Sequence, residues 1–192
     1  MNRRNIIFSL IVVIGVILDQ WTKLWVVRNI PVYRGEITII PNWLSLVHVK
    51  NPGAAMGMLQ TFEYRQHLFA VFTVIAFVII IDLFRKLPKD DWFLSTTMGL
   101  ILSGAIGNAI DRVRFQEVTD FVKVYTEVPW QKSWLINTFG TNEWPSFNVA
   151  DSALMVGAFL FLIHYLFLEE DEANEKPETN SIPPSQQVTP EE

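Results

Sequence analysis

The stretch Phe147-Asn148-Val149-Ala150-Asp151-Ser152 opens the last long apolar run of this 192-residue chain. Asn148 is a favourable helix N-cap, and an acid three residues later, Asp151, is typical of a capping box. The sequence therefore predicts that a long apolar helix begins here with a carboxylate in its first turn. That carboxylate serves either as a cap alone or, in addition, as part of a polar site.

Four apolar runs account for a composition that is 50% hydrophobic and only 18% charged. Because a membrane-spanning helix needs about 20 mostly apolar residues, these runs predict four spans. They cover about residues 6–27, 66–84, 92–111 and 149–168. The expected fold class is a membrane α-helical domain over residues 1–168, with four transmembrane helices and a small β-element outside them.

The first run is not expected to be a cleaved signal peptide. It is long, it contains Asp19 and Lys23, and no small-x-small cleavage site follows it. Asp19 and Lys23 are four residues apart and share one helix face. Since charged groups within a bilayer are costly, they predict either an intrahelical ion pair or a brace for a polar site.

The net charge of −5 is concentrated at the end of the chain, because residues 169–192 carry −7 and the remainder carries +2. This composition predicts a disordered acidic tail. No basic stripe indicates nucleic-acid binding. The chain has no cysteine and only three scattered histidines, so neither a thiol nucleophile nor a zinc site is expected. No metal or cofactor is predicted.

Basic residues suggest how the spans are oriented. Arg3 and Arg4 precede the first span, and the short link 85–91 carries three more Lys and Arg residues. Positive charge in short loops favours the cytoplasmic side, so both termini are expected there. The outer, periplasmic segments are then residues 28–65 and 112–148.

The outer segments carry strand patterns. Residues 36–41 and 44–49 partly alternate between apolar and polar side chains, which predicts two short strands. Residues 117–124 alternate more clearly and place Asp120 on the same face as three valines. Burial among apolar neighbours would raise the pKa of Asp120. The segment 125–146 is rich in tryptophan, which indicates anchoring at the membrane interface or a flap over a site.

The third span has two features of its own. Gly99, Ser103 and Gly107 recur every four residues and predict a face for close helix packing. Asp111 lies at the end of the span, where an acid opposes the helix dipole, so it needs a cation as a partner. The candidates are Lys23 and the neighbouring arginines, Arg112 and Arg114.

Two carboxylates that meet at one membrane surface can share a proton, activate water and protonate a leaving amine. Asp120 and Asp151 are the candidates, because apolar burial favours a protonated Asp120 and the helix N-terminus favours an ionised Asp151. Two alternatives remain open. One is a small transporter with Asp19 and Asp111 in a proton relay. The other is a membrane scaffold packed through Gly99.

Five ordered motifs resemble those of bacterial lipoprotein signal peptidase, also called signal peptidase II. They are Asp19-Gln20-Trp21-Thr22-Lys23, Asn51-Pro52-Gly53-Ala54-Ala55, Gly107-Asn108-Ala109-Ile110-Asp111-Arg112, Val118-Thr119-Asp120-Phe121 and Phe147-Asn148-Val149-Ala150-Asp151-Ser152. The resemblance implies four spans, a small periplasmic β-element and an aspartic peptidase whose catalytic pair is Asp120 and Asp151. The residues that would line or brace the site are Asp19, Lys23, Asn51, Gly53, Asn108, Asp111, Arg112 and Asn148.

The implied reaction removes signal peptides from prolipoproteins, on the N-terminal side of a diacylglyceryl-modified cysteine. The implied partners are those prolipoproteins, membrane lipid and globomycin-type inhibitors. A monomer in the bacterial cytoplasmic (inner) membrane is expected, with its site at the periplasmic face. Three features depart from the resemblance: a longer stretch between Asp120 and Asp151, Met56 in place of a frequent aromatic, and the acidic tail.

Overall fold

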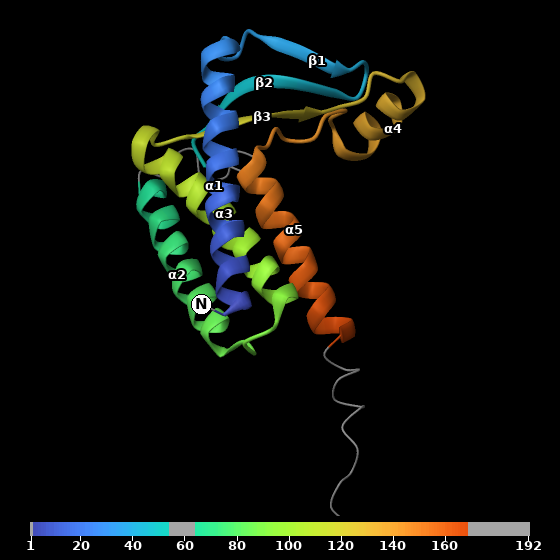
Figure 1. The fold of residues 1–192 in the computed structure, drawn as a ribbon. Helices are drawn as coiled ribbons and strands as arrows, with labels where there is room; N and C mark the ends of the chain where they lie inside the picture. The colour runs from blue at the N-terminus through green and yellow to red at the C-terminus, as the bar shows by residue number, and fades with distance from the viewer. Residues whose placement is uncertain (1, 54–63, 169–192) are drawn as a thin grey trace, which may run out of the picture.

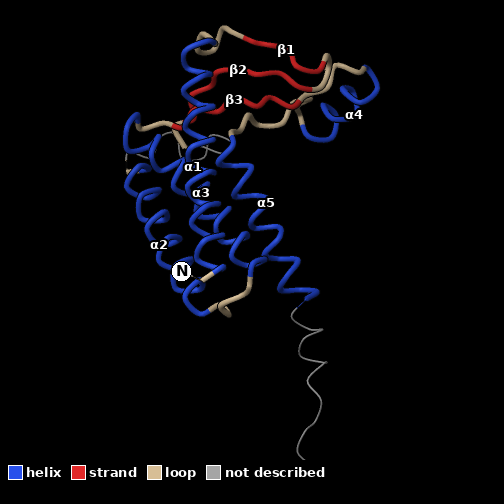
Figure 2. Tube along the Cα trace, in the orientation of Figure 1, coloured by secondary structure: helices blue, strands red, loops and turns tan. Residues whose placement is uncertain are grey.

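The computed structural model describes residues 2–53 and 64–168 of the chain (Figures 1 and 2). Within these residues, four long helices form a bundle, and three strands lie across one end of it. The predictions for Ala54, Ala55 and Met56, and that of a disordered tail over residues 169–192, lie outside the described residues.

The four long helices confirm the predicted membrane α-helical fold. They are α1 (Arg3–Asn29), α2 (Arg65–Lys86), α3 (Trp92–Phe115) and α5 (Val149–Ile163), which continues as one π-helical turn over His164–Leu168. Each is long and apolar enough to cross a membrane. Most side chains of α1, α2 and α5 point away from the protein, as expected for helices that face lipid.

The central helix of the bundle is α3, which packs against α1, α2 and α5. A Cβ atom added to Gly99 would lie 3.0 Å from Ile11 of α1, and one added to Gly107 would lie 2.5 Å from the Asp19 carboxylate. Likewise, a Cβ atom added to Gly15 of α1 would lie 2.6 Å from the hydroxyl oxygen of Ser103. The predicted small-residue face is therefore confirmed, and it brings α1 close enough for Asp19 to reach α3.

Three antiparallel strands form the sheet in the order β1 (Glu36–Ile40), β2 (Leu44–Asn51) and β3 (Val118–Val124). The pairing of β2 with β3 sets Val49 opposite Asp120. A cluster of Val26, Ile30 and Phe121 then joins the end of α1 to β3. The sheet is thus attached to the bundle at the end where β3 begins.

One detail of β3 differs from the alternating pattern. Asp120 is buried as predicted, but Thr119 and Phe121 on the opposite face are buried as well, and Val124 is exposed. The prediction that one face of this strand is buried and the other exposed was therefore wrong. Burial in β3 follows distance from the bundle instead, because the strand begins immediately after α3 and contacts both α1 and α3 there.

A fifth helix, α4 (Pro129–Phe139), was not predicted. Proline stands at its start, and Gly140 ends it with a left-handed backbone (φ 77°), which glycine adopts without strain. Figure 1 shows α4 beyond the far end of β3, to one side of the bundle.

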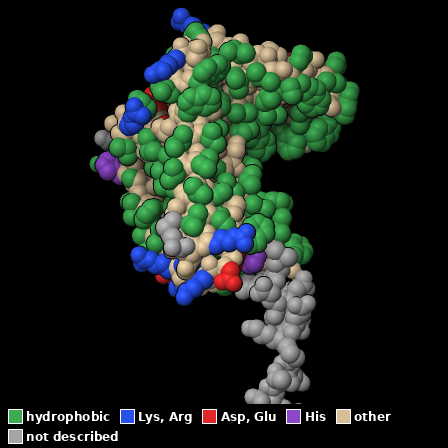
Figure 3. All heavy atoms as spheres, in the orientation of Figure 1, with side chains coloured by type: hydrophobic (Ala, Val, Ile, Leu, Met, Phe, Trp, Pro, Cys, Tyr) green, Lys and Arg blue, Asp and Glu red, His purple; other side chains and the backbone are tan. Residues whose placement is uncertain are grey.

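The end of the bundle opposite the sheet is basic. Arg4 donates a hydrogen bond to the carbonyl oxygen of Leu87 and lies over the ring of Phe84, which brings the start of α1 next to the α2–α3 link. In Figure 3, Lys and Arg side chains lie at this end and again beside the sheet, whereas hydrophobic side chains cover much of the helices between them.

Candidate active site

Polar side chains from three helices and two strands meet where the bundle joins the sheet. Every candidate residue that the described motifs supplied lies in or beside this cluster, and most of them form one hydrogen-bonded network. The network includes Asp19, Lys23, Asn51, Asn108, Asp111, Asp120, Asn148 and Asp151.

Asn148 and Asp151 form the predicted capping box at the start of α5. The Asn148 side-chain oxygen accepts a hydrogen bond from the Asp151 backbone N–H at 2.9 Å, and Asp151 Oδ2 accepts one from the Asn148 N–H at 3.1 Å. The other carboxylate oxygen of Asp151, Oδ1, accepts a hydrogen bond from Asn108 Nδ2 at 2.7 Å. Capping and site-building are therefore combined in the same carboxylate.

Asp120 is held from two sides at the buried end of β3. Asn148 Nδ2 donates to its Oδ1 at 2.7 Å, and Asn51 Nδ2 donates to its Oδ2 at 2.9 Å. The side chain is 2% exposed. Burial, reinforced by the negative charge of Asp151, raises the pKa of Asp120 to about 6, although the hydrogen bonds from Asn51 and Asn148 act in the opposite direction.

Two asparagine amides connect the two aspartates. Asn148 donates to Asp120 Oδ1 from its side-chain nitrogen and to Asp151 Oδ2 from its backbone N–H. The same side-chain nitrogen lies 3.1 Å from Asn108 Oδ1, while Asn108 Nδ2 contacts Asp151. The arrangement therefore fixes both carboxyl groups relative to each other through neutral donors.

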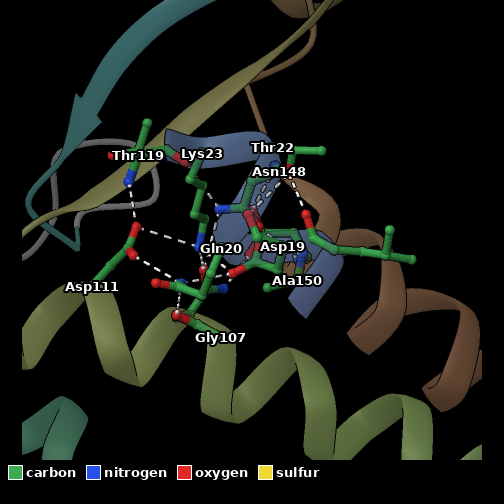
Figure 4. Close-up of polar contacts among 12 residues, drawn as sticks. Asp19, Gln20, Thr22, Lys23, Gly107, Asp111, Thr119, Asn148 and Ala150 are labelled. Atoms are coloured by element: carbon green, nitrogen blue, oxygen red, sulfur yellow. Dashed lines mark hydrogen bonds and ion pairs between the residues drawn. The ribbon is translucent and has the colours of Figure 1, made fainter. Parts of the chain in front are cut away.

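A buried lysine orients Asn108. Figure 4 shows this lysine, Lys23, between Asp19 and Asp111. Lys23 Nζ lies 2.9 Å from Asp19 Oδ2, 3.3 Å from Asp111 Oδ2 and 3.0 Å from Asn108 Oδ1. Since the ammonium group can only donate, it holds the oxygen of the Asn108 amide and directs the nitrogen to Asp151. Lys23 is thus the partner that Asp111 requires, and the Asp19–Lys23 pair both spans one helix turn and braces the site.

Sequence reasoning missed three donors that complete this cluster. Gln20 Nε2 lies 3.1 Å from both Asp19 Oδ2 and Asp111 Oδ1, and the backbone N–H groups of Ala150 and Thr119 donate to Asp19 and Asp111 at 3.0 Å. Gln20 stands inside the first motif, beside Asp19, so its position was a usable signal. Backbone donors could not be found in this way, because the residue type does not show where a backbone N–H group points.

Gly53 occupies a position that only glycine tolerates. Its φ is 95°, and an added Cβ would collide with the ring of Phe69 in α2. Its backbone N–H donates to Asn51 Oδ1 at 2.9 Å, which turns the Asn51 nitrogen toward Asp120. Gly53 therefore positions a side chain that holds a carboxylate.

Arg112 supplies positive charge beside the carboxylates. Its guanidinium lies 4.6 Å from the centre of the Phe69 ring, and it interacts electrostatically with Asp151, Asp120 and Asp111. Across residues 2–53 and 64–168, no three His, Asp or Glu side chains are grouped so that they could hold a metal ion. The chemistry that these residues offer is acid–base chemistry by paired carboxyls next to a cation.

The Asp111→Asn variant is expected to lose stability more than catalytic rate. Asparagine can still accept from the Thr119 N–H, but it gives up the ion pair with Lys23, so a loss of about 1–3 kcal/mol is expected. Thermal unfolding in detergent and turnover at a temperature where the variant is folded separate the two effects. Unchanged thermal stability with no turnover would show that this ranking is wrong.

Comparisons with known proteins agree on one family. A family model described as signal peptidase (SPase) II matches residues 11–167. The chain is 40% identical over 157 residues to the lipoprotein signal peptidase of Geobacter metallireducens, covering 82% of this chain and 88% of that protein. It is 42% identical over 158 residues to that of Geobacillus kaustophilus, covering 82% and 91%. A solved structure, described as a bacterial membrane enzyme determined by the in meso method at 1.9 Å resolution, matches with a TM-score of 0.69 and 30% identity, covering 83% of this chain and 92% of that one.

Proposed function

Because this chain belongs to the signal peptidase II family, we propose that it removes signal peptides from prolipoproteins as an aspartic endopeptidase of the bacterial inner membrane. Its substrates carry a diacylglyceryl-modified cysteine, and the bond that it cleaves lies on the N-terminal side of that cysteine. The observation that carries the proposal is that Asn148 donates hydrogen bonds to both carboxyl groups, to Asp120 from its side-chain nitrogen and to Asp151 from its backbone N–H.

In the proposed reaction, the two carboxyls share one proton at the start. Asp120, buried and with a raised pKa, keeps the proton, while Asp151 in the first turn of α5 is ionised. Asp151 removes a proton from water, and the oxygen of that water bonds to the scissile carbonyl carbon. Asp120 gives its proton to the carbonyl oxygen, which leaves a neutral gem-diol.

The second half of the reaction breaks the peptide bond. Asp151, protonated in the first half, gives its proton to the leaving nitrogen as the carbon–nitrogen bond breaks. One gem-diol hydroxyl returns its proton to Asp120 and becomes the carbonyl of the new carboxyl end. Arg112 limits the build-up of negative charge at the pair, and no covalent intermediate with the enzyme forms.

The remaining proposals concern placement and partners. The positive charge of Arg3, Arg4 and the short α2–α3 link supports cytoplasmic termini and a site at the periplasmic face. Asp19, Asp111, Asp120 and Asp151 all gather at the opposite end of the bundle, which argues against a relay of acids across the membrane. A monomer suffices for the site, and globomycin-type peptides are the expected inhibitors.

Cleavage of a purified, diacylglyceryl-modified prolipoprotein tests the function. The expected result is one cut before the modified cysteine by the protein in detergent or bilayers, with far slower cutting of the same precursor without its lipid. Failure of folded protein to cut the lipid-modified precursor would overturn the proposal, and the transport alternative would then deserve a flux assay.

The rate is expected to depend on pH through Asp120. Its pKa in the folded protein is about 6 against an ordinary value of 3.8, so its contribution to stability is present below pH 3.8 and is lost as the pH rises through about 6. The same ionisation removes the shared proton, so kcat/KM should fall above about pH 6. Bound substrate excludes more water, which should move the alkaline limb of kcat to higher pH.

The Asn51→Ala variant provides the matched test of this assignment. Asn51 donates to the Asp120 carboxylate and favours its ionised form, so its removal should shift the alkaline limb of kcat/KM upward. A kcat/KM that stays level from about pH 5 to about pH 8 in the parent protein would contradict the role of Asp120.

A further inference from the structure

The helix α4 has an apolar face that nothing in the described protein covers. None of its residues is buried, and Trp130, Trp134 and Phe139 are 71%, 58% and 66% exposed. These aromatics and Leu135 spread over half of the helix circumference and all line one cavity, while Ser133 lies on the other half and does not. An isolated helix of 11 residues is marginal in water, so α4 needs a partner for this face.

The uncovered face lines a large cavity. Its volume is about 940 Å³, and its walls are α4, the end of β3 and the segment that returns from α4 toward Asn148. Trp43, from the turn between β1 and β2, and Trp144 add two more aromatic side chains. A cavity of this size would admit more than one hydrocarbon chain.

Several of the polar groups around this cavity are already engaged with one another. The Thr126 hydroxyl donates to Gln131 at 2.8 Å, and Asn142 donates to the Thr126 carbonyl oxygen at 2.9 Å. The backbone N–H groups of Thr126 and Trp144 are likewise bonded, to the carbonyl oxygens of Asn142 and Val124. A peptide backbone placed here would find few free partners and would lose its hydrogen bonds to water, whereas a hydrocarbon chain needs none.

Charge around the cavity is paired within the protein. Lys132 lies 2.6 Å from Glu127, and Lys123 contacts both Glu36 and Glu143. Among the described residues beside the cavity, no cationic patch is therefore left to attract an anionic headgroup. The attraction that the surface offers is burial of aromatic and aliphatic side chains.

The position of α4 relative to the bundle identifies the apolar medium. The sheet lies across the end of four membrane-spanning helices, and α4 lies beyond the far end of β3, to one side of the bundle (Figure 1). In Figure 3, hydrophobic side chains cover most of this overhanging part of the molecule. Tryptophans at such a level match the interfacial region of a bilayer.

We infer that α4 docks on the membrane leaflet at the sheet end of the bundle, with phospholipid acyl chains entering the cavity between Trp130, Trp134, Leu135, Phe139 and Trp144. The helix would then lie in the interface plane and hold the far end of the sheet at a fixed height. This inference does not depend on the peptidase reaction.

Single cysteines provide a direct test, because the natural chain has none. The variants Leu135→Cys, in the cavity, and Ser133→Cys, on the opposite face of α4, would each carry a nitroxide in phosphatidylcholine bilayers. The expected ratio of collisions with oxygen to collisions with a water-soluble nickel complex is several-fold higher at position 135. Adding phosphatidylglycerol should leave this ratio unchanged, since the attraction is not electrostatic.

Three outcomes would overturn the inference. Equal, water-like ratios at both positions would mean that lipid does not enter the cavity. Spin–spin broadening at position 135 would identify a second copy of the chain as the occupant. If position 135 became protected from both oxygen and the nickel complex only after a lipid-modified precursor is added, the precursor would be the occupant of the cavity.

Discussion

Replacing Asp120 or Asp151 with asparagine is expected to lower the rate of prolipoprotein cleavage by about 10³-fold or more, while the protein still inserts and folds. Each variant keeps the size of the side chain and one of its two accepting oxygens, but neither can accept and return a proton. The two losses should not add in a double variant, because the carboxyls act as one unit.

Stability measurements distinguish lost chemistry from lost structure. The raised pKa of Asp120 means that its ionised form destabilises the fold above about pH 6, so Asp120→Asn should unfold at no lower a temperature than the parent near pH 8. Asp82→Asn is the matched control, because Asp82 is an exposed carboxylate on α2 that pairs only with Lys86 among the described residues. Full activity in either Asp120→Asn or Asp151→Asn would remove the carboxylate pair from the mechanism.

The Lys23→Met variant is expected to produce the largest loss of stability, about 3–5 kcal/mol. It leaves Asp19 and Asp111 buried together without their shared cation, and it releases the oxygen of Asn108. Cleavage should fall as well, since a freed Asn108 amide no longer presents its nitrogen to Asp151 in one orientation. Thermal unfolding in detergent and turnover of the folded fraction measure the two effects.

Lys86→Met is an informative control for that variant. Lys86 and Asp82 have the same four-residue spacing as Lys23 and Asp19, but their side chains are 70% and 57% exposed rather than 4% and 1%. Loss of the exposed pair should cost at most about 0.5 kcal/mol. The Lys23→Met/Asp111→Asn double variant should lose less stability than the sum of the two single variants. It also removes one of the two carboxylates that Lys23→Met leaves without a cation. Equal effects of Lys23→Met and Lys86→Met would contradict the bracing role of Lys23.

The bundle was predictable because each span is a long apolar run, and the strands were predictable from short alternating segments. By contrast, α4 escaped prediction because its 11 residues bury nothing in the protein, so no apolar stripe facing a core marks them. The burial of β3 was misjudged for a related reason. An alternating pattern is typical of a strand with one face exposed to water. Thr119 and Phe121 are instead enclosed by neighbouring elements that are distant in sequence.

The residues of the site were easier to predict from the sequence than the hydrogen bonds between them. Two carboxylates at the edge of the spans could be paired from their positions and from the resemblance of their motifs. The orientation of each asparagine amide could not be predicted, because it depends on which neighbouring group donates a hydrogen bond and cannot accept one. Lys23 determines the orientation of Asn108, and the N–H of Gly53 determines that of Asn51. These contacts join residues up to 85 positions apart.

The capping box of α5 also has a consequence for how the protein is made. Asn148 begins the last helix and at the same time holds Asp120, so the polar network closes only when that helix has formed. A nascent chain whose first three helices have been inserted already carries Lys23, Asn108 and Asp120, but it has neither Asn148 nor Asp151. Hydrolytic competence would therefore arrive in one step at the end of biogenesis, after the last helix leaves the ribosome and enters the bilayer.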